Sequence, residues 1–127
     1  MSRPSYGSIG WVDLTAPDAP QLRDFYEKVA GWSPRPLSMG KYEDYTMNTE
    51  SGEAVAGICH ARGSNANLPP VWLIYIVVEN LDAALQHCRD GGGEVVSPIR
   101  MAGGSRFAVI KDPAGAHAAL WEPAAAA

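Results

Sequence analysis

The sequence predicts an α+β domain built from two βαβββ modules, whose sheets enclose a concave cleft. Two segments, residues 8–31 and 71–93, each have the pattern of a strand followed by an amphipathic helix. A shift of 62 residues brings these segments into register, and the strands that follow them register as well. Because a half-length module buries too little surface to be stable alone, we expect the two modules to form one domain over residues 1–127.

The first module is expected at residues 7–61, and it opens with the strand "SIGWVDLTA". Successive side chains of a strand point to opposite faces. Val12 and Leu14 therefore form a core face, while Trp11 and Asp13 share the other face. An aromatic ring beside a carboxylate is typical of a lined pocket, so we expect this second face to look into the cleft.

A helix follows the first strand, with Asp18 as its N-cap, Gln21 three residues later and Gly31 at its end. Its apolar stripe has i, i+3, i+4, i+7 spacing and consists of Leu22, Phe25, Tyr26 and Val29. Strands at 45–49 and 53–61 belong to the same module, which is predicted to have about three strands after its helix.

The second module is expected at residues 71–123, after a polar, proline-ended linker at 62–70. Asn80 is the expected N-cap of its helix, and the glycines at 91–93 end it. The apolar stripe of this helix consists of Leu81, Ala84, Leu85 and Cys88. The shift of 62 residues places the strand 107–111 on 45–49 and relates Arg106 to Asp44. We expect both of these residues to face the cleft and Phe107 to pack under the helix.

Composition and charge exclude several classes of function. The net charge is −4 with no basic run, which argues against nucleic acid or an anionic membrane as partner. No segment approaches the roughly 20 apolar residues of a membrane span, and the N-terminus lacks a signal-peptide pattern. Two cysteines, Cys59 and Cys88, are too few for a disulfide framework. We therefore expect a cytoplasmic protein with free thiols.

Two stretches carry a resemblance to a known family. "IGWVDLTAPDAPQLRDFYEKVAGW" resembles the opening of the vicinal oxygen chelate superfamily, which groups glyoxalase I, extradiol dioxygenases and the bleomycin- and fosfomycin-resistance proteins. "DPAGAHAALWEP" resembles the turn and last strand of the same family. The resemblance extends over about residues 7–123 and implies the glyoxalase/bleomycin-resistance fold. It implies less about function, because one fold hosts many chemistries.

The metal-dependent members of this superfamily take ligands from four strand positions around the cleft. Carried over by the resemblance, these positions are Trp11, Gly57, Leu73 and Ala119. None of these side chains offers an imidazole, carboxylate, amide or thiolate donor. We therefore expect no metal and no other cofactor. An alternative is a site displaced by two residues along the same face, at Asp13, Cys59 and His117.

Asp13 and His117 are the candidate catalytic residues, because a carboxylate near an imidazole supports acid–base chemistry. The candidate ligand-binding residues are Trp11, Cys59, Leu73, Tyr75, Arg106 and Trp121. The aromatic members suit a planar ligand and Arg106 suits an anionic one. Cys59 requires a neighbour that lowers its pKa to act as a nucleophile. Each residue also has a plain structural role, as cavity filler or as solvated surface.

Two classes of function fit these observations. The first is a small-molecule-binding protein that sequesters an aromatic or antibiotic-like ligand without a metal, as the resemblance to resistance proteins implies. The second is a glyoxalase- or dioxygenase-like lyase or isomerase that uses Asp13 or His117. A third possibility is a vestigial or regulatory domain that acts by dimerising. A homodimer is expected in each case, because sheet edges at the module ends favour pairing.

Overall fold

The computed structural model describes residues 5–124, apart from the side chain of Ser64. The chain is an α+β protein that divides into two compact units. We call Trp11–Trp72 the N-terminal unit, and we call residues up to Gly10 together with those from Leu73 onward the C-terminal unit. Within the described residues, neither α-helix is long and apolar enough to cross a membrane.

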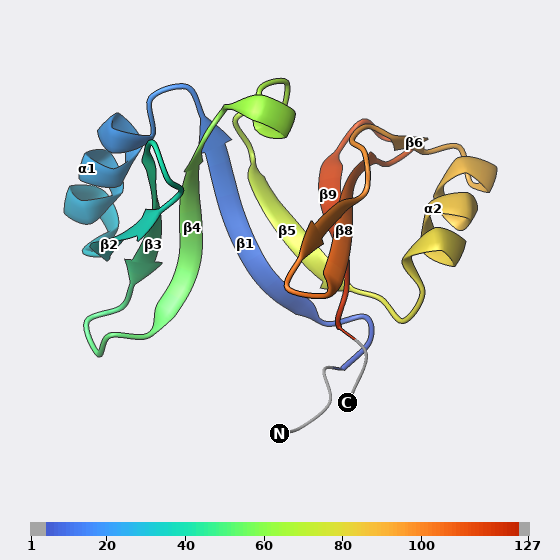
Figure 1. Cartoon of the computed structure of the whole chain (residues 1–127), viewed down its shortest axis with the longest axis horizontal. Coiled ribbons are helices and arrows are strands. Elements are labelled where there is room, and N and C mark those ends of the chain that lie inside the picture. The colour runs from blue at the N-terminus through green and yellow to red at the C-terminus, as the bar shows by residue number, and fades with distance from the viewer. Residues whose placement is uncertain (1–4, 125–127) are drawn as a thin grey trace. The chain divides into compact units, whose positions relative to one another are not determined.

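The N-terminal unit contains one helix and a sheet of four strands (Figure 1). In chain order its elements are β1 (Ile9–Ala16), α1 (Ala19–Ala30), β2 (Ser33–Ser38), β3 (Glu43–Asn48), β4 (Ala54–His60) and the short 3-10 helix η1 (Gly63–Asn65). The strand order is β2-β3-β4-β1, with β1 parallel to β4 and the other neighbours antiparallel. Helix α1 covers one face of this sheet, over a core of Ala19, Tyr45, Met47, Ala56 and Ile58.

Helix α1 begins and ends where the sequence predicts. The side chain of Asp18 accepts a hydrogen bond of 3.1 Å from the backbone N–H of Gln21, and Gly31 adopts the left-handed conformation at φ 72°. The predicted apolar stripe is only half buried, however. Leu22 and Tyr26 pack against the core, whereas Phe25 and Val29 are 52% and 65% exposed. The sheet contacts only part of the stripe, so spacing along the helix alone overestimates its buried width.

The C-terminal unit has the same order of strand, helix and further strands (Figure 1). Its elements are β5 (Trp72–Val77), α2 (Leu81–Asp90), β6 (Glu94–Val95), β7 (Arg100–Ala102), β8 (Ser105–Lys111) and β9 (His117–Glu122). The strand order is β5-β9-β8-β6, and β7 pairs with β8 as well. Helix α2 covers one face, over a core of Leu81, Leu85, Ala108 and Leu120. Asn80 caps the helix, as predicted, by accepting from the N–H of Ala83 at 3.0 Å.

Strands β3 and β8 differ by one residue from the predicted register between the two modules. Thr46 pairs with Gly57 in the N-terminal unit, and Val109 pairs with Ala119 in the C-terminal unit. Gly57 and Ala119 are 62 positions apart, but Thr46 and Val109 are 63 apart. A slip of one residue exchanges the two faces of a strand. The predicted match of Asp44 with Arg106 is therefore wrong.

Candidate functional surfaces

The N-terminal unit has a polar sheet face on the side opposite α1. Successive side chains of β1, β3 and β4 point alternately into the core under α1 and towards this face. We call it the polar face; its residues are Trp11, Asp13, Thr15, Asp44, Thr46, Asn48, Gly57 and Cys59. The strand pairing therefore agrees with the prediction that Trp11 and Asp13 share one face.

Side-chain hydrogen bonds order the polar face. Thr46 donates from Oγ1 to Asn48 Oδ1 at 3.1 Å, and Asn48 donates from Nδ2 to the carbonyl of Gly52 at 3.0 Å. Asp44 Oδ1 accepts from the backbone N–H of His60 at 3.0 Å and lies 3.2 Å from His60 Nδ1. Asp44 and Asn48 are both buried, so these bonds satisfy groups that water does not reach.

Gly57 lies against the side chains of Asp13 and Trp11. A Cβ atom built on Gly57 would be 3.1 Å from Asp13 Cβ and 3.4 Å from Trp11 Nε1. The indole edge thus lies next to the backbone of Gly57. No side chain larger than hydrogen fits at position 57 without displacing one of these neighbours.

Cys59 is a poor nucleophile in this surrounding. Burial raises the pKa of the Cys59 thiol far above its ordinary value, and the carboxylates of Asp13 and Asp44 raise it further. The thiol also donates a hydrogen bond to Asp44, which stabilises the neutral form. Because the thiolate is the reactive species, Cys59 acts here as a small, half-buried donor.

The C-terminal unit has an aromatic sheet face on the side opposite α2. We define the aromatic face as Tyr75, Phe107 and Trp121, from β5, β8 and β9. Phe107 and Trp121 are stacked, with centroids 5.3 Å apart and ring planes at 21°. Tyr75 lies 6.0 Å from Phe107 and 6.3 Å from Trp121, and the guanidinium of Arg100 lies 5.5 Å from the Phe107 centroid. All three rings are half-buried, so part of their surface is accessible.

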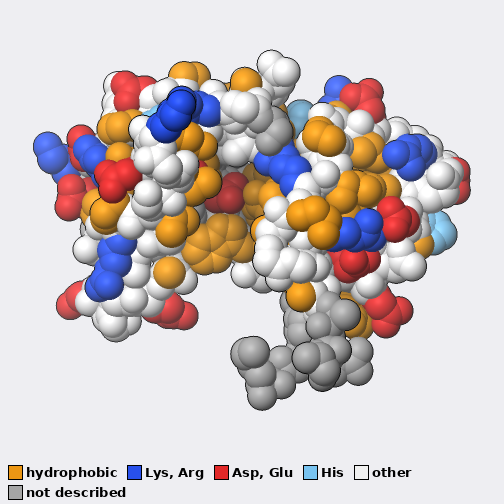
Figure 2. Space-filling view, in the orientation of Figure 1, with side chains coloured by type: hydrophobic (Ala, Val, Ile, Leu, Met, Phe, Trp, Pro, Cys, Tyr) orange, Lys and Arg blue, Asp and Glu red, His pale blue; other side chains and the backbone are white. Residues whose placement is uncertain are grey.

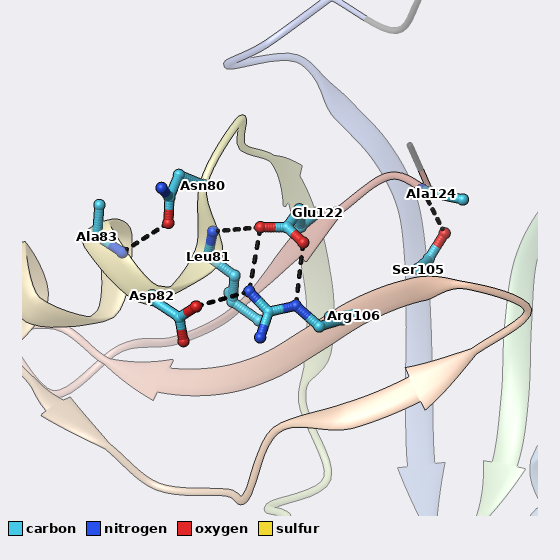
Figure 3. Close-up of polar contacts among 8 residues, drawn as sticks. All are labelled: Asn80, Leu81, Asp82, Ala83, Ser105, Arg106, Glu122 and Ala124. Atoms are coloured by element: carbon cyan, nitrogen blue, oxygen red, sulfur yellow. Dashed lines mark hydrogen bonds and ion pairs between the residues drawn. The ribbon is translucent and has the colours of Figure 1, made fainter. Parts of the chain in front are cut away.

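Arg106 is placed on the other side of this sheet, contrary to the predicted arrangement (Figure 3). Its guanidinium donates to Glu122 Oε2 at 3.0 Å and to Asp82 Oδ2 on α2 at 2.9 Å. The prediction had Arg106 facing the cleft and Phe107 packed under the helix. Because the register differs by one residue, each of the two side chains lies on the face opposite to the predicted one. Phe107 belongs to the aromatic face, and Arg106 contacts the N-terminal end of α2.

The remaining candidates are distributed over both units. Leu73 is buried at the start of β5, and His117 is half-buried at the start of β9, opposite Lys111 in the ladder. Asp13 belongs to the N-terminal unit and His117 to the C-terminal unit. The predicted site residues did not include Asp44 and Phe107, which belong to these faces. The strand pairing identifies them, because it depends on register and not on residue type.

Comparison with known proteins identifies the family. The model of the Glyoxalase/Bleomycin resistance protein/Dioxygenase superfamily matches residues 8–120. The chain belongs to this superfamily. A protein of Mycobacterium tuberculosis named putative glyoxylase CFP32 is 37% identical over 122 residues, which is 91% of this chain and 46% of that protein. Anthracycline biosynthesis protein DnrV of Streptomyces peucetius is 31% identical over 95% of this chain and 49% of its own length.

Solved structures of the superfamily show the same fold. Methylmalonyl-CoA epimerase from Mycobacterium tuberculosis aligns with a TM-score of 0.59 at 17% identity, over 98% of this chain and 94% of that one. Hypothetical protein BH1468 from Bacillus halodurans aligns with the same TM-score at 12% identity, over 94% of this chain and 96% of that one. The present chain spans about half the length of the curated relatives it matches.

The four positions at which the superfamily resemblance places metal ligands do not fit a metal. The indole of Trp11 and the absent side chain of Gly57 offer no donor, and Leu73 and Ala119 are apolar and buried. Across residues 5–124, no cluster of three or more His, Cys, Asp or Glu side chains has the geometry of a metal site. The residues present therefore do not support a mechanism that runs through a metal at the family position.

Proposed function

We propose that this chain is a small-molecule-binding member of the superfamily that acts without a metal, and that its ligand has a planar aromatic part. The observation that carries the proposal is the aromatic face. Three rings from three adjacent strands lie together on a half-buried surface. A soluble domain gains stability by burying such rings fully, so a cluster left partly accessible is a candidate contact surface for a ligand.

The geometry of the face suits a flat ligand. Phe107 and Trp121 are nearly parallel, and an aromatic pair contributes roughly 0.5–1.5 kcal/mol beyond the area it buries. The guanidinium of Arg100 beside Phe107 adds a positive charge that favours an electron-rich or anionic ring. Two relatives support this choice by name, since they are anthracycline biosynthesis proteins and an anthracycline has a planar polycyclic core.

The two phenylalanines of the chain offer a matched test. Phe107 belongs to the aromatic face, whereas Phe25 is exposed on α1. We expect calorimetry with anthraquinone-2-carboxylate and with an anthracycline aglycone to detect binding. Phe107→Leu should weaken it by about tenfold, the equivalent of about 1.4 kcal/mol. Phe25→Leu should leave it unchanged. No binding to either probe, or equal losses in both variants, would contradict the proposal.

A second candidate function is a lyase or isomerase that uses Asp13 or His117 as a base. It is supported by the relative named a putative glyoxylase, at 37% identity. The test is turnover of the hemithioacetal of methylglyoxal and glutathione by the metal-free protein. Whichever of Asp13→Asn and His117→Ala removes the base should lower the rate by two orders of magnitude or more, the usual contribution of about 10²- to 10⁴-fold from a general base. Full activity in both variants would reject this candidate.

A further inference from the structure

The end of β4 contains an imidazole whose orientation is fixed by a buried carboxylate. Asp44 is only 7% exposed, and its Oδ1 contacts both the backbone N–H and the Nδ1 atom of His60, at 3.0 Å and 3.2 Å. The His60 side chain is 18% exposed, so solvent reaches part of the ring. Two contacts from one carboxylate oxygen to one residue restrict both the backbone and the side chain of that histidine.

This arrangement selects one tautomer of His60. In a neutral imidazole one nitrogen carries the proton and the other accepts a hydrogen bond. A carboxylate next to Nδ1 favours the proton there, which makes Nε2 the accepting nitrogen. This is the role that the aspartate has in a serine–histidine–aspartate triad.

An aromatic ring and a cation lie next to this imidazole. The ring of Tyr42 is 5.3 Å from the His60 ring in an edge-on arrangement. The guanidinium of Arg62 lies 4.1 Å from the Tyr42 centroid, and the backbone N–H of Arg62 donates to the carbonyl of His60 at 2.9 Å. We call these four residues, Tyr42, Asp44, His60 and Arg62, the His60 patch. It combines a proton acceptor, an aromatic surface and an exposed positive charge.

We propose that the His60 patch binds a phenol that carries a carboxylate group, and that His60 accepts the phenol proton. The ligand carboxylate pairs with Arg62, and the hydroxyl lies against Nε2 of His60. In the transfer the phenol O–H bond breaks and an Nε2–H bond forms. The electron pair stays on the phenolate oxygen, and Asp44 retains its contact with Nδ1–H. A phenol is chosen because its pKa of about 10 lies within reach of an imidazole, unlike that of an aliphatic alcohol.

Other groups that titrate or carry charge also face His60. Tyr45 lies 6.5 Å away in ring centroids, on β3, and Cys59 precedes His60 on β4. The pKa of the Cys59 thiol is raised by burial and by nearby carboxylates, so this thiol is uncharged near neutral pH. The charges beside the ring are therefore the carboxylate of Asp44 and the guanidinium of Arg62, which the proposal already uses. The site lies within the N-terminal unit and does not rest on the aromatic face.

The test uses 4-hydroxycinnamate, because its phenolate absorbs at longer wavelength than its phenol form and outside the protein absorbance. At about pH 7.5 the free probe keeps its phenol proton, and adding the intact protein should increase the phenolate absorbance to saturation. Two analogues separate the parts of the ligand. Cinnamate, which lacks the hydroxyl, should compete weakly, and 4-vinylphenol, which lacks the carboxylate, should show a smaller increase. No increase with the complete probe overturns the proposal.

Variants assign the effect to the patch. His60→Gln should abolish the absorbance increase, and Arg62→Gln should weaken binding by about tenfold, as expected for the loss of one charge-assisted contact. His87→Gln is the matched control, because His87 is exposed on α2. An unchanged signal in His60→Gln overturns the proposal. Phe107→Leu should also leave this signal intact, which separates it from the proposed function.

One measurement needs no variant of the patch. Nitrogen-15 spectra of the imidazoles in the wild-type protein should show His60 with a protonated Nδ1 and an accepting Nε2 above neutral pH. Saturation with the probe should convert the Nε2 resonance to the protonated form. A His60 ring that is protonated at Nε2 before the probe is added, or unaffected by it, overturns the proposal even if His60→Gln fails to fold.

Discussion

Arg106 and Glu122 face each other directly in the β8–β9 ladder, and the Arg106 Nε donates to Glu122 Oε2 at 3.0 Å (Figure 3). Glu122 Oε1 also accepts the backbone N–H of Leu81, the first residue of α2, at 2.8 Å. Asp82 in the first turn of the helix pairs with the same guanidinium. The network therefore attaches the N-terminal end of α2 to the sheet and satisfies a helix amide that has no partner within the helix.

Removing Glu122 should destabilise the C-terminal unit. We expect Glu122→Ala to lower the free energy of unfolding by about 1–2 kcal/mol, the usual cost of losing a capping acceptor at a helix start. The exposed Glu79, two residues before α2, is the control, and Glu79→Ala should change stability by less than about 0.5 kcal/mol. Urea denaturation measures both. Equal effects would show that the network contributes nothing specific.

The same network predicts how stability depends on pH. The hydrogen bond from Arg106 lowers the pKa of Glu122, and the bond from the Leu81 amide lowers it further. The stabilisation is therefore complete above the pKa of an unfolded glutamate, about 4.3, and is lost as the pH falls through the lower folded value. The stability difference between wild type and Glu122→Gln should be largest near pH 7 and shrink towards pH 3. A difference that is constant with pH would contradict this explanation.

Cys59 should react slowly with thiol reagents in the folded protein. In Cys88→Ser, the only remaining thiol should react with Ellman's reagent at pH 8 at least about tenfold more slowly than in the same protein unfolded in urea. Asp13→Asn should accelerate the reaction, because it removes one of the carboxylates that raise the pKa of Cys59. Rapid reaction in folded Cys88→Ser would mean that the thiol is not protected by burial.

Adding a methyl group at Gly57 should destabilise the N-terminal unit by about 1 kcal/mol or more, in the range found for overpacked sites. The new Cβ would lie 3.1 Å from Asp13 Cβ and 3.4 Å from Trp11 Nε1. Trp11→Phe replaces the indole with a smaller ring, so Gly57→Ala should lower the stability less in the Trp11→Phe protein than in the wild type. Thermal unfolding of the four proteins of this double-mutant cycle measures the coupling. An additive cycle would show that the indole does not restrict position 57.

Charged side chains of both signs occur on the visible surface. On the face drawn in Figure 2, basic and acidic side chains are interspersed and form no continuous field of one sign. Nucleic-acid-binding surfaces need a basic stripe or patch. That nucleic acid is not a partner stays a prediction from the net charge of −4.

The sequence predicted both α-helices, their caps and the longer strands because those depend on near neighbours in the chain, but it did not locate β2, β6 and β7. Asp18 and Asn80 cap the two helices through contacts three residues away, and Gly31 ends α1 with a positive φ. The sharing of one face by Trp11 and Asp13 also follows from local alternation. The family followed from two such stretches, and its model matches residues 8–120.

Only the tertiary structure decided the pairing of the strands, and this pairing determines which side chains are in contact. The single-residue difference between β3 and β8 moved Phe107 onto the aromatic face and Arg106 to the start of α2. The sequence also did not predict the contact between Asp44 and His60, because these residues lie 16 positions apart on different strands. Local patterns therefore determined the fold class and the faces. The register between strands, which depends on long-range packing and hydrogen bonding, determined the surfaces available for chemistry.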